Sequence, residues 1–193
     1  STGLDYPPGS YADTNELIDL SKVVMSLGGF YHTHVRSNLK KRSPLAPWEE
    51  AVEIGRKSGI PVHLTHYRQY FQGDSSHLDY LALVENARVR GVDVTFDCYT
   101  YPHSSTSVTI LLPHWAKDGG PEALMYRLSS NDDRLKMKGD IDADQLENNW
   151  LTNFRQPANK KYDGKLLTDI AGIRNQEPAD ALFDLLVEEN LSI

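Results

Sequence analysis

The sequence predicts an α/β fold built on a parallel sheet. A helical pattern, a glycine, a short extended run and a polar loop follow one another three times, about every 30 residues, which is the length of a βαβ unit. Strands that alternate with helices in this way pair in parallel through right-handed crossovers. The pattern alone is compatible with an open doubly wound sheet and with a closed barrel. In either fold the functional groups collect at the carboxyl ends of the strands.

The predicted helices have sequence signals at both ends. Asp13 and Glu16 have the spacing of a capping box at the first helix, and Pro47 suits the first turn of the second. Glycine after the last helical turn is the usual stop signal. The predicted helices run from Asp13 or Thr14 to a stop at Gly28, from about Pro47 to Lys57 with a stop at Gly59, and from near Ser76 to a stop at Gly91. The first carries Leu17, Leu20, Val24 and Leu27 at helical spacing.

The predicted strands cover residues 30–35, 60–65 and 92–98. After Ser107 the repeat ends. In that part Val108–Leu112 is expected as a short strand or a buried turn, residues 151–154 as a strand and residues 130–164 mainly as surface structure or an insertion. Further helices are expected at 121–128, 142–148, 165–171 and 178–189.

We therefore predict one partial domain over residues 1–193. Its regular βα units would occupy residues 1–107, and residues 108–193 would form an insertion and further helices. The sequence starts without an initiator methionine or a signal-peptide pattern and stops abruptly at Ile193. We expect it to be a piece of a longer fold.

Composition excludes several classes of function. The net charge of −7 without a basic stripe argues against a nucleic acid partner. The sequence contains no run of 18 apolar residues that would predict a membrane span. The single cysteine, Cys98, rules out an internal disulfide and agrees with a reducing, cytoplasmic compartment. Cys98 itself is expected to be a small core residue.

The most informative motif is a repeated Thr-His-x-Arg, at Thr33–Arg36 and at Thr65–Arg68. Each copy ends a predicted strand, and neighbouring parallel strands lie about 4.8 Å apart. Two imidazoles at equivalent strand ends would reach one metal ion, and neutral imidazole suits Zn²⁺. We predict that His34 and His66 bind zinc, although strand-end histidines that bond loop carbonyls remain the alternative.

Other polar residues near these strand ends are weaker candidates. Arg36 and Arg68 each suit a substrate carboxylate, or else a salt bridge to a neighbouring loop. Asp97 suits either a metal ligand or a residue that supports one. Tyr99 would donate a hydrogen bond to substrate or pack in the loop, and His32 would line the site one layer below His34.

Four blocks, in order, resemble the N-acyl-D-amino-acid deacylase (D-aminoacylase) family of the amidohydrolase superfamily. They are Ser1–Ala12, Tyr31–Arg36, Val62–Arg68 and Val94–Tyr101, followed by Ser105–Thr106. The resemblance implies a partial TIM-type (β/α)8 barrel in which residues 1–3 leave strand four and the three predicted strands are strands five to seven.

The same resemblance implies the roles of single residues. His34 and His66 match the family's metal-binding histidines on strands five and six. Arg68 stands where the family usually has a lysine that contacts the substrate carboxylate, and Tyr99 matches a substrate-contacting tyrosine. Thr100 departs from the usual proline. The family's His-x-His, its metal-binding cysteine and its catalytic aspartate have no counterpart in these 193 residues, so no catalytic residue is expected here.

The function implied is zinc-dependent hydrolysis of the amide bond of N-acyl-D-amino acids, with the chain itself inactive when alone. A non-catalytic α/β module that binds carboxylates is one alternative, and an amidohydrolase for a cyclic amide is another. The expected partner is the small-molecule N-acyl amino acid. A partial barrel leaves open sheet edges, which predicts self-association of the isolated chain.

Overall fold

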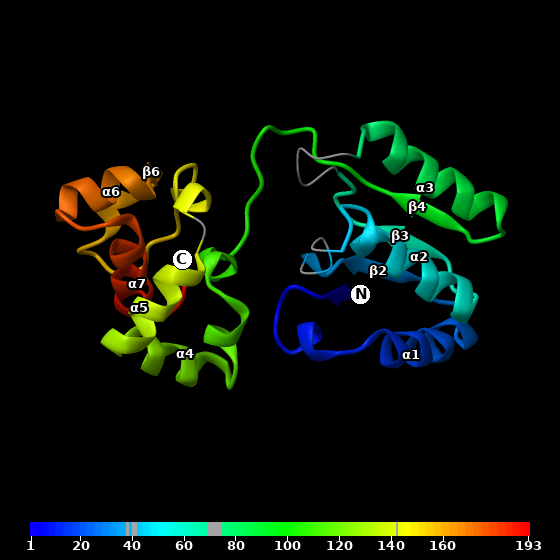
Figure 1. Ribbon diagram of the computed structural model, residues 1–193, viewed down its shortest axis with the longest axis horizontal. Helices are drawn as coiled ribbons and strands as arrows, with labels where there is room; N and C mark the ends of the chain where they lie inside the picture. Colours follow the sequence, from blue (N-terminus) through cyan, green and yellow to red (C-terminus); the bar gives the residue numbers. More distant parts are fainter. Residues whose placement is uncertain (38, 40–41, 69–74, 142) are drawn as a thin grey trace. The chain divides into compact units, whose positions relative to one another are not determined.

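The computed structural model describes residues 1–37, 39, 42–68, 75–141 and 143–193 (Figure 1). The chain divides into two compact units, Ser1–Ser104 and Ser105–Ile193. This boundary lies close to the point where the βα repeat ends in the sequence. Assignment of both units to one partial barrel domain stays a prediction.

The first unit contains the parallel sheet that the repeat predicts. Its strands are β1 (Thr2–Gly3), β2 (Tyr31–His34), β3 (Val62–Leu64) and β4 (Val94–Phe96). They lie side by side in the order β1-β2-β3-β4, and each neighbouring pair is parallel. Strands that follow one another in sequence and in space, with helical crossovers, are the arrangement found in a β/α barrel.

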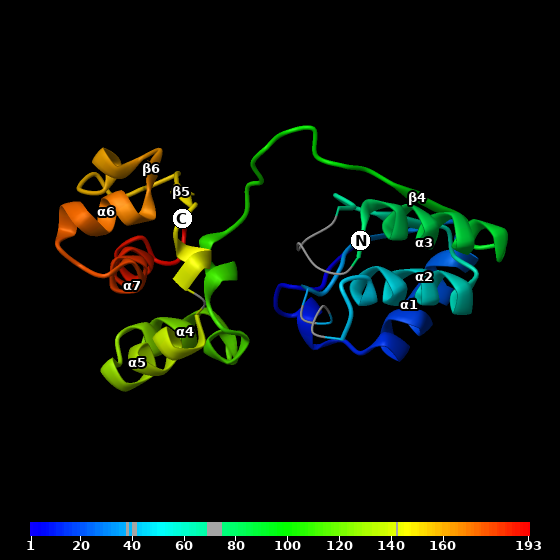
Figure 2. The same cartoon turned by 45° about the horizontal axis from the view of Figure 1, so that its top comes forward.

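Helices cover one face of this sheet and leave the other face polar. In both views α1 (Thr14–Ser26), α2 (Ala46–Ser58) and α3 (His77–Val89) follow one another alongside the strands (Figure 2). Val62 and Leu64 are buried, whereas His63 between them is only partly buried. Because side chains alternate along a strand, the histidines face away from the helices.

The local signals at the helix ends are largely confirmed. The Asp13 side chain accepts a hydrogen bond from the backbone N–H of Glu16. Gly59 caps α2 in a left-handed conformation, with φ of 74°. Ser76 and Asp79 form a reciprocal capping box at α3 that the sequence analysis did not anticipate.

The apolar stripe expected on α1 is largely wrong. Leu17 is buried, but the next buried positions are Ile18 and Ser21. The remaining members of the expected stripe, Leu20, Val24 and Leu27, are exposed. The periodicity located the helix correctly, but it could not choose between two adjacent apolar faces.

The second unit is mostly helical. Its main helices are α4 (Gly120–Leu128), α5 (Asn131–Asp140), α6 (Leu167–Arg174) and α7 (Pro178–Glu188). Short 3-10 helices occur at Gly9–Tyr11 (η1) in the first unit and at Val108–Leu111 (η3), His114–Lys117 (η4), Ala143–Leu146 (η5) and Lys160–Tyr162 (η6) in the second. A two-stranded antiparallel sheet pairs β5 (Trp150–Leu151) with β6 (Lys165–Leu166).

This unit differs from the sequence prediction in several places. Val108–Leu111 is a 3-10 helix with Val108 and Leu112 buried, which agrees with the expected buried turn and not with the expected strand. The expected helix at 165–171 begins as strand β6 and becomes helical at Leu167. Residue 142 of the expected 142–148 helix lies outside the described residues. The stretch 130–164, expected as surface structure, contains α5 and buries Met137 and Phe154 completely.

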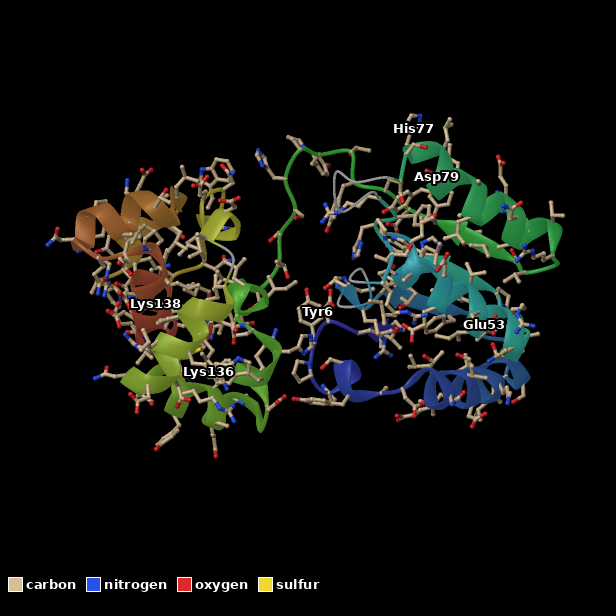
Figure 3. All side chains as sticks on the ribbon, viewed as in Figure 1. Tyr6, Glu53, His77, Asp79, Lys136 and Lys138 are labelled. Atoms are coloured by element: carbon tan, nitrogen blue, oxygen red, sulfur yellow. The ribbon has the colours of Figure 1, made fainter. Side chains whose placement is uncertain are left out.

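Two charged residues of α5, Arg134 and Lys138, form ion pairs with residues of α7 or its N-cap. Lys138 of α5 (labelled in Figure 3) forms ion pairs with Glu177 and with Asp180 of α7. Arg134, also on α5, pairs with Asp184 at 2.7 Å. The polar composition that suggested a surface insertion therefore includes residues that join two helices. No described helix is long and apolar enough to cross a membrane.

Candidate metal centre

His34 and His66 lie together at the carboxyl ends of β2 and β3. The distance between His34 Nδ1 and His66 Nε2 is 2.8 Å. We expected both histidines to lie at the end of a strand. His66 instead lies in a turn, because β3 ends at Leu64, and its φ is 43°. A positive φ is uncommon outside glycine, and such residues concentrate at functional sites.

Asp5 fixes the orientation of the His34 ring. Its Oδ2 atom lies 3.0 Å from His34 Nε2, while its Oδ1 atom accepts hydrogen bonds from the backbone N–H and the hydroxyl of Ser37. Burial alone would raise the pKa of Asp5, but the hydrogen bonds from His34 and Ser37 outweigh it and lower this pKa. The resulting carboxylate accepts Nε2–H, so that Nδ1 keeps its lone pair toward His66.

This arrangement fits a metal ion. Histidine ligands commonly donate their second ring N–H to a carboxylate, as His34 does to Asp5. Ligand atoms of a tetrahedral zinc site lie about 3.3 Å apart, given bonds of about 2.0–2.1 Å, so the rings need to separate only slightly. Burial and the neighbouring His34 and Arg68 lower the pKa of His66, which favours its neutral form. Only neutral imidazole has a lone pair for a metal.

Tyr99 and Arg68 lie beside the two histidines. The Tyr99 ring is stacked on the His66 ring, with centroids 5.9 Å apart and planes at 5°. The Arg68 guanidinium carbon lies 5.5 Å from the centre of the Tyr99 ring, within range of a cation–π contact. Both side chains are exposed. The structure thus brings together the four residues singled out in the sequence, while their roles stay predictions.

Arg36 is held inside the first unit by an ion pair and a hydrogen bond. Its Nε donates to Glu50 at 2.8 Å and its Nη2 donates to the carbonyl oxygen of Ala12. The Arg36 and Glu50 side chains are 11% and 9% exposed. An arginine buried in such a pair is not free to meet a substrate, which leaves Arg68 as the candidate clamp.

Asp97 supports the turn at His66. Its Oδ1 atom accepts a hydrogen bond from the backbone N–H of His66, and its Oδ2 atom lies 3.0 Å from His63 Nε2. The expectation that Cys98 is a core residue is wrong, because Cys98 is exposed and donates to the carbonyl of Tyr67 at 3.1 Å. The strand ends at Phe96, so alternation no longer directs this side chain inward.

Sequence reasoning missed Asp5. It was assigned to a loop because proline and glycine follow it closely. A signal was present, since Asp5 comes two residues after the first short strand and therefore lies at the same sheet edge as the histidines. That strand is only two residues long, too short for any periodicity to reveal it.

Parallel βα units with a histidine pair at their carboxyl edge are the arrangement of part of a β/α barrel. No family model matches the sequence. Curated relatives do match. The chain is 35% identical to N-acyl-D-glutamate deacylase of Alcaligenes xylosoxydans xylosoxydans over 117 residues, which are 60% of this chain and 23% of that protein.

Two more curated proteins of the same organism are similar to the chain. D-aminoacylase is 36% identical over 107 residues, 55% of this chain and 22% of that protein. N-acyl-D-aspartate deacylase is 33% identical over 135 residues, 64% of this chain and 26% of that protein. The matches confirm the resemblance to the D-aminoacylase family, and the matched part is about a quarter of each relative's length.

Solved structures support the same fold. A zinc and phosphonate complex of N-acyl-D-glutamate deacylase from Bordetella bronchiseptica superposes with a TM-score of 0.62 and 24% identity, covering 94% of this chain and 31% of that one. A crystal structure of D-aminoacylase gives a TM-score of 0.59 and 23% identity over the same shares. The partial barrel fold is therefore confirmed.

Proposed function

We propose that this chain forms part of a metal-dependent amidohydrolase that cleaves the amide bond of N-acyl-D-amino acids. The observation that carries the proposal is the approach of His34 Nδ1 to His66 Nε2, 2.8 Å apart at the carboxyl edge of a parallel sheet. In barrels of this type that edge is where active sites are built. The curated relatives are named as deacylases of N-acyl-D-glutamate and N-acyl-D-aspartate and as D-aminoacylase.

His34 and His66 would hold the metal, and zinc suits two neutral imidazoles. The relative from Bordetella was solved with zinc, and another solved D-aminoacylase is described as having a binuclear metal centre. A bound zinc ion supplies an acidified water and polarises the amide carbonyl. Asp5 keeps His34 in the tautomer that presents Nδ1.

Arg68 and Tyr99 would hold the α-carboxylate of the substrate. Arg68 is exposed, and a planar guanidinium binds a carboxylate through two parallel hydrogen bonds. Tyr99 limits where the guanidinium can lie, because the two groups are in contact. The hydrolysed bond would then lie between this clamp and the histidine pair, which also contacts Tyr99 through His66.

The surface of α1 supports membership of a larger barrel. Its exposed apolar residues are neighbours on or just after one helix: Leu20, Val23, Val24, Leu27 and Phe30. In a closed barrel such a surface packs against the helix of the preceding βα unit. The structural superpositions extend over 94% of the chain, which is more than the first unit alone. We therefore assign residues 1–193 to one partial domain.

The test uses the protein encoded by the complete reading frame. His34→Ala and His66→Ala should each lower the zinc content and reduce deacylation of N-acetyl-D-glutamate and N-acetyl-D-aspartate by at least about a hundredfold. His77→Ala is the matched control, since His77 is exposed at the start of α3. Unchanged zinc content and activity in both variants would contradict the proposal.

The carboxylate clamp has its own test. Arg68→Ala should raise KM by at least about tenfold with a smaller effect on kcat, because it removes binding shared by substrate and transition state. Arg68→Lys should recover part of this loss. A carboxylate-binding module without hydrolytic function would bind the N-acyl amino acid but release no free amino acid.

We also propose that the isolated chain self-associates. The compartment that we propose for the protein is a reducing, cytoplasmic one. β1 and β4 are the edges of the four-stranded sheet, and open edges pair readily with other strands. The single cysteine suits a reducing compartment. Light scattering of the purified chain should give a mass above 21.8 kDa. A monomer at high concentration would contradict the association.

A further inference from the structure

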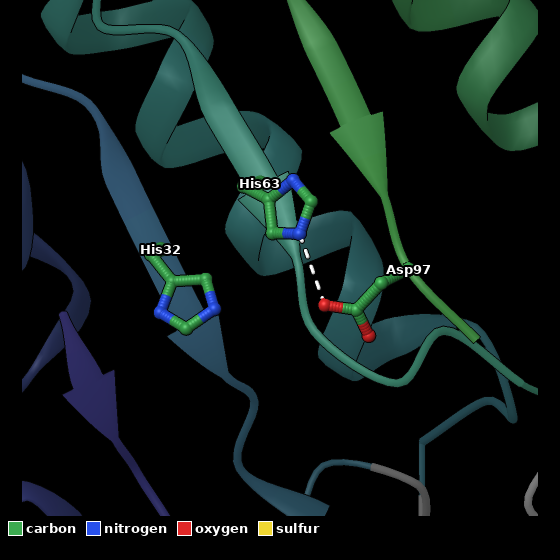
Figure 4. Close-up of side chains that lie close together, drawn as sticks. All are labelled: His32, His63 and Asp97. Carbon is green, nitrogen blue, oxygen red and sulfur yellow. Dashed lines mark hydrogen bonds and ion pairs between the residues drawn. The ribbon is translucent and has the colours of Figure 1, made fainter. Parts of the chain in front are cut away.

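A second group of ligating side chains lies on the polar face of the sheet, separate in composition from His34 and His66. It consists of His32 on β2, His63 on β3 and Asp97 just beyond β4 (Figure 4). One nitrogen or oxygen atom of each residue lies within 4.8 Å of the others. The deacylase function proposed above assigns no chemistry to this cluster.

The strand register brings the three residues together. His32 is the Cα partner of His63, and His63 is the Cα partner of Thr95. Asp97 follows Thr95 by two residues, just beyond β4, where its backbone N–H donates to the carbonyl oxygen of Leu64 and its carbonyl oxygen accepts from the N–H of Tyr67. The two imidazole rings are stacked, with centroids 5.3 Å apart and planes at 28°. The strand ladder thus places the two histidines, and these backbone hydrogen bonds place Asp97 beside them.

The hydrogen bonds of His63 place its Nε2 atom beside a carboxylate. His63 Nδ1 lies 2.8 Å from Thr95 Oγ1, and a hydroxyl at this distance can donate to a ring nitrogen or accept from it. His63 Nε2 lies 3.0 Å from Asp97 Oδ2. Nε2 donates to the carboxylate when it carries the ring proton, and when it does not, the nitrogen and the carboxylate oxygen can share a metal ion.

His32 completes a set typical of zinc. Its Nε2 atom faces His63 and Asp97 (Figure 4), and it lies 2.5 Å from the hydroxyl of Thr65, which can donate to this nitrogen when no ion is bound. Two imidazoles and one carboxylate suit zinc and other borderline divalent ions such as Co²⁺. The 3.0 Å between His63 Nε2 and Asp97 Oδ2 is already close to the spacing of about 3.3 Å in a tetrahedral site.

We propose that His32, His63 and Asp97 bind a divalent metal ion of the zinc type. Asp97 connects this site to the turn beyond β3, because its other oxygen accepts from the backbone N–H of His66. A metal ion at the cluster would therefore hold Asp97 in place and stabilise the backbone conformation that directs His66 toward His34. The site stands independently of the deacylase function.

The experiment titrates the purified 193-residue chain with Zn²⁺ by calorimetry and with Co²⁺ by visible absorption. The double variant His34→Ala/His66→Ala removes the other histidine pair and should still bind about one equivalent of either metal. Adding His63→Gln to this background should abolish the binding, and adding Asp97→Asn should weaken it at least about tenfold. His77→Ala is the control for loss of an imidazole outside the cluster and should change nothing.

Two results would overturn the proposal. One is a folded double variant, judged by circular dichroism, that binds no metal. The other is unchanged binding after His63→Gln is added. If a variant fails to fold, NMR of the imidazole nitrogens in the unaltered chain provides the test. Zinc should shift the Nε2 signal of His63, whereas a ring that keeps its proton on Nε2 and ignores zinc would show that a proton joins it to Asp97.

Discussion

The two units of the chain use their polar residues in different ways. In the first, polar side chains gather at one edge of the sheet, where His34, His66 and Arg68 lie beside one another in structure. In the second, charged residues mainly join helices, as Lys138 does between α5 and α7. Within the described residues, the only group of three or more ligands suited to a metal lies in the first unit. A regular βα repeat collects functional groups at one edge, and an irregular helical unit offers no such edge.

The two units also bury charge differently. In the first unit a cation and an anion are buried together, as Arg36 with Glu50. In the second unit Glu189 is 2% exposed and is satisfied by neutral donors, the backbone N–H groups of Arg155 and Gln156 and the side-chain amide of Asn159. This difference predicts different responses to mutation and to pH.

The largest effect is expected from the core of the second unit. Phe183 of α7 is completely buried, and Phe183→Ala should lower the free energy of unfolding by about 3–5 kcal/mol through lost burial and a cavity. Urea unfolding followed by circular dichroism measures this. Tyr126→Ala is the control, because Tyr126 is exposed on α4. If the units unfold independently, protease cleavage should increase only in residues 105–193, and equal cleavage in both units would contradict that independence.

The next effect concerns the buried ion pair of the first unit. Arg36→Met leaves the Glu50 carboxylate buried without its partner, and such a loss costs about 3 kcal/mol or more. Arg56→Met is the matched control, because Arg56 pairs with Glu53 at the exposed surface of α2, where solvent screens an ion pair and its loss should change the stability much less. Urea midpoints that shift equally in both variants would show that burying Arg36 and Glu50 does not increase the stability lost when their ion pair is broken.

A smaller effect is expected from pH at Glu189. Burial tends to raise the pKa of this carboxyl, but the hydrogen bonds from Asn159, Arg155 and Gln156 prevail and lower it. A lowered pKa in the folded state means that Glu189 stabilises the fold above its unfolded pKa, about 4.3, and loses this contribution as the pH falls through the folded pKa. Glu189→Gln should therefore remove this part of the acid sensitivity of the second unit.

Thermal unfolding between pH 7 and pH 3 measures this dependence. The original chain should lose more stability on acidification than the Glu189→Gln variant. Glu177→Gln is a suitable control, because Glu177 has an exposed side chain at the start of the same helix. A pH dependence that is identical for the Glu189 variant and the original chain would contradict the role of the carboxylate.

The smallest effect is expected at the N-cap of α1. Asp13→Ala removes the hydrogen bond to the N–H of Glu16 and should cost about 1 kcal/mol. Asp19→Ala, at an exposed position that pairs with Lys22 on the surface of α1, should change the stability by less. Calorimetry of the chain compares the two variants. A larger loss for Asp19 than for Asp13 would contradict the assignment of the cap.

Much of the first unit was predictable because its signals are local. Helix boundaries followed from Asp13 and Gly59, and the strand-end histidines followed from the repeated Thr-His-x-Arg. The second unit was less predictable. Strand β6 and the burial of Met137 depend on contacts between residues distant in sequence, which periodicity does not reveal.

In the first unit, the sequence by itself determined the order of helices and strands, the parallel sheet and the types of residue at the strand ends, because these depend on short-range periodicity and backbone preference. Only the tertiary structure decided how those residues meet. Contacts between segments more than 25 residues apart fix three features of the site. They are the turn at His66, the position of Asp5 beside His34 and the approach of His63 to Asp97. Such contacts arise from the packing of neighbouring strands, and no local pattern encodes them.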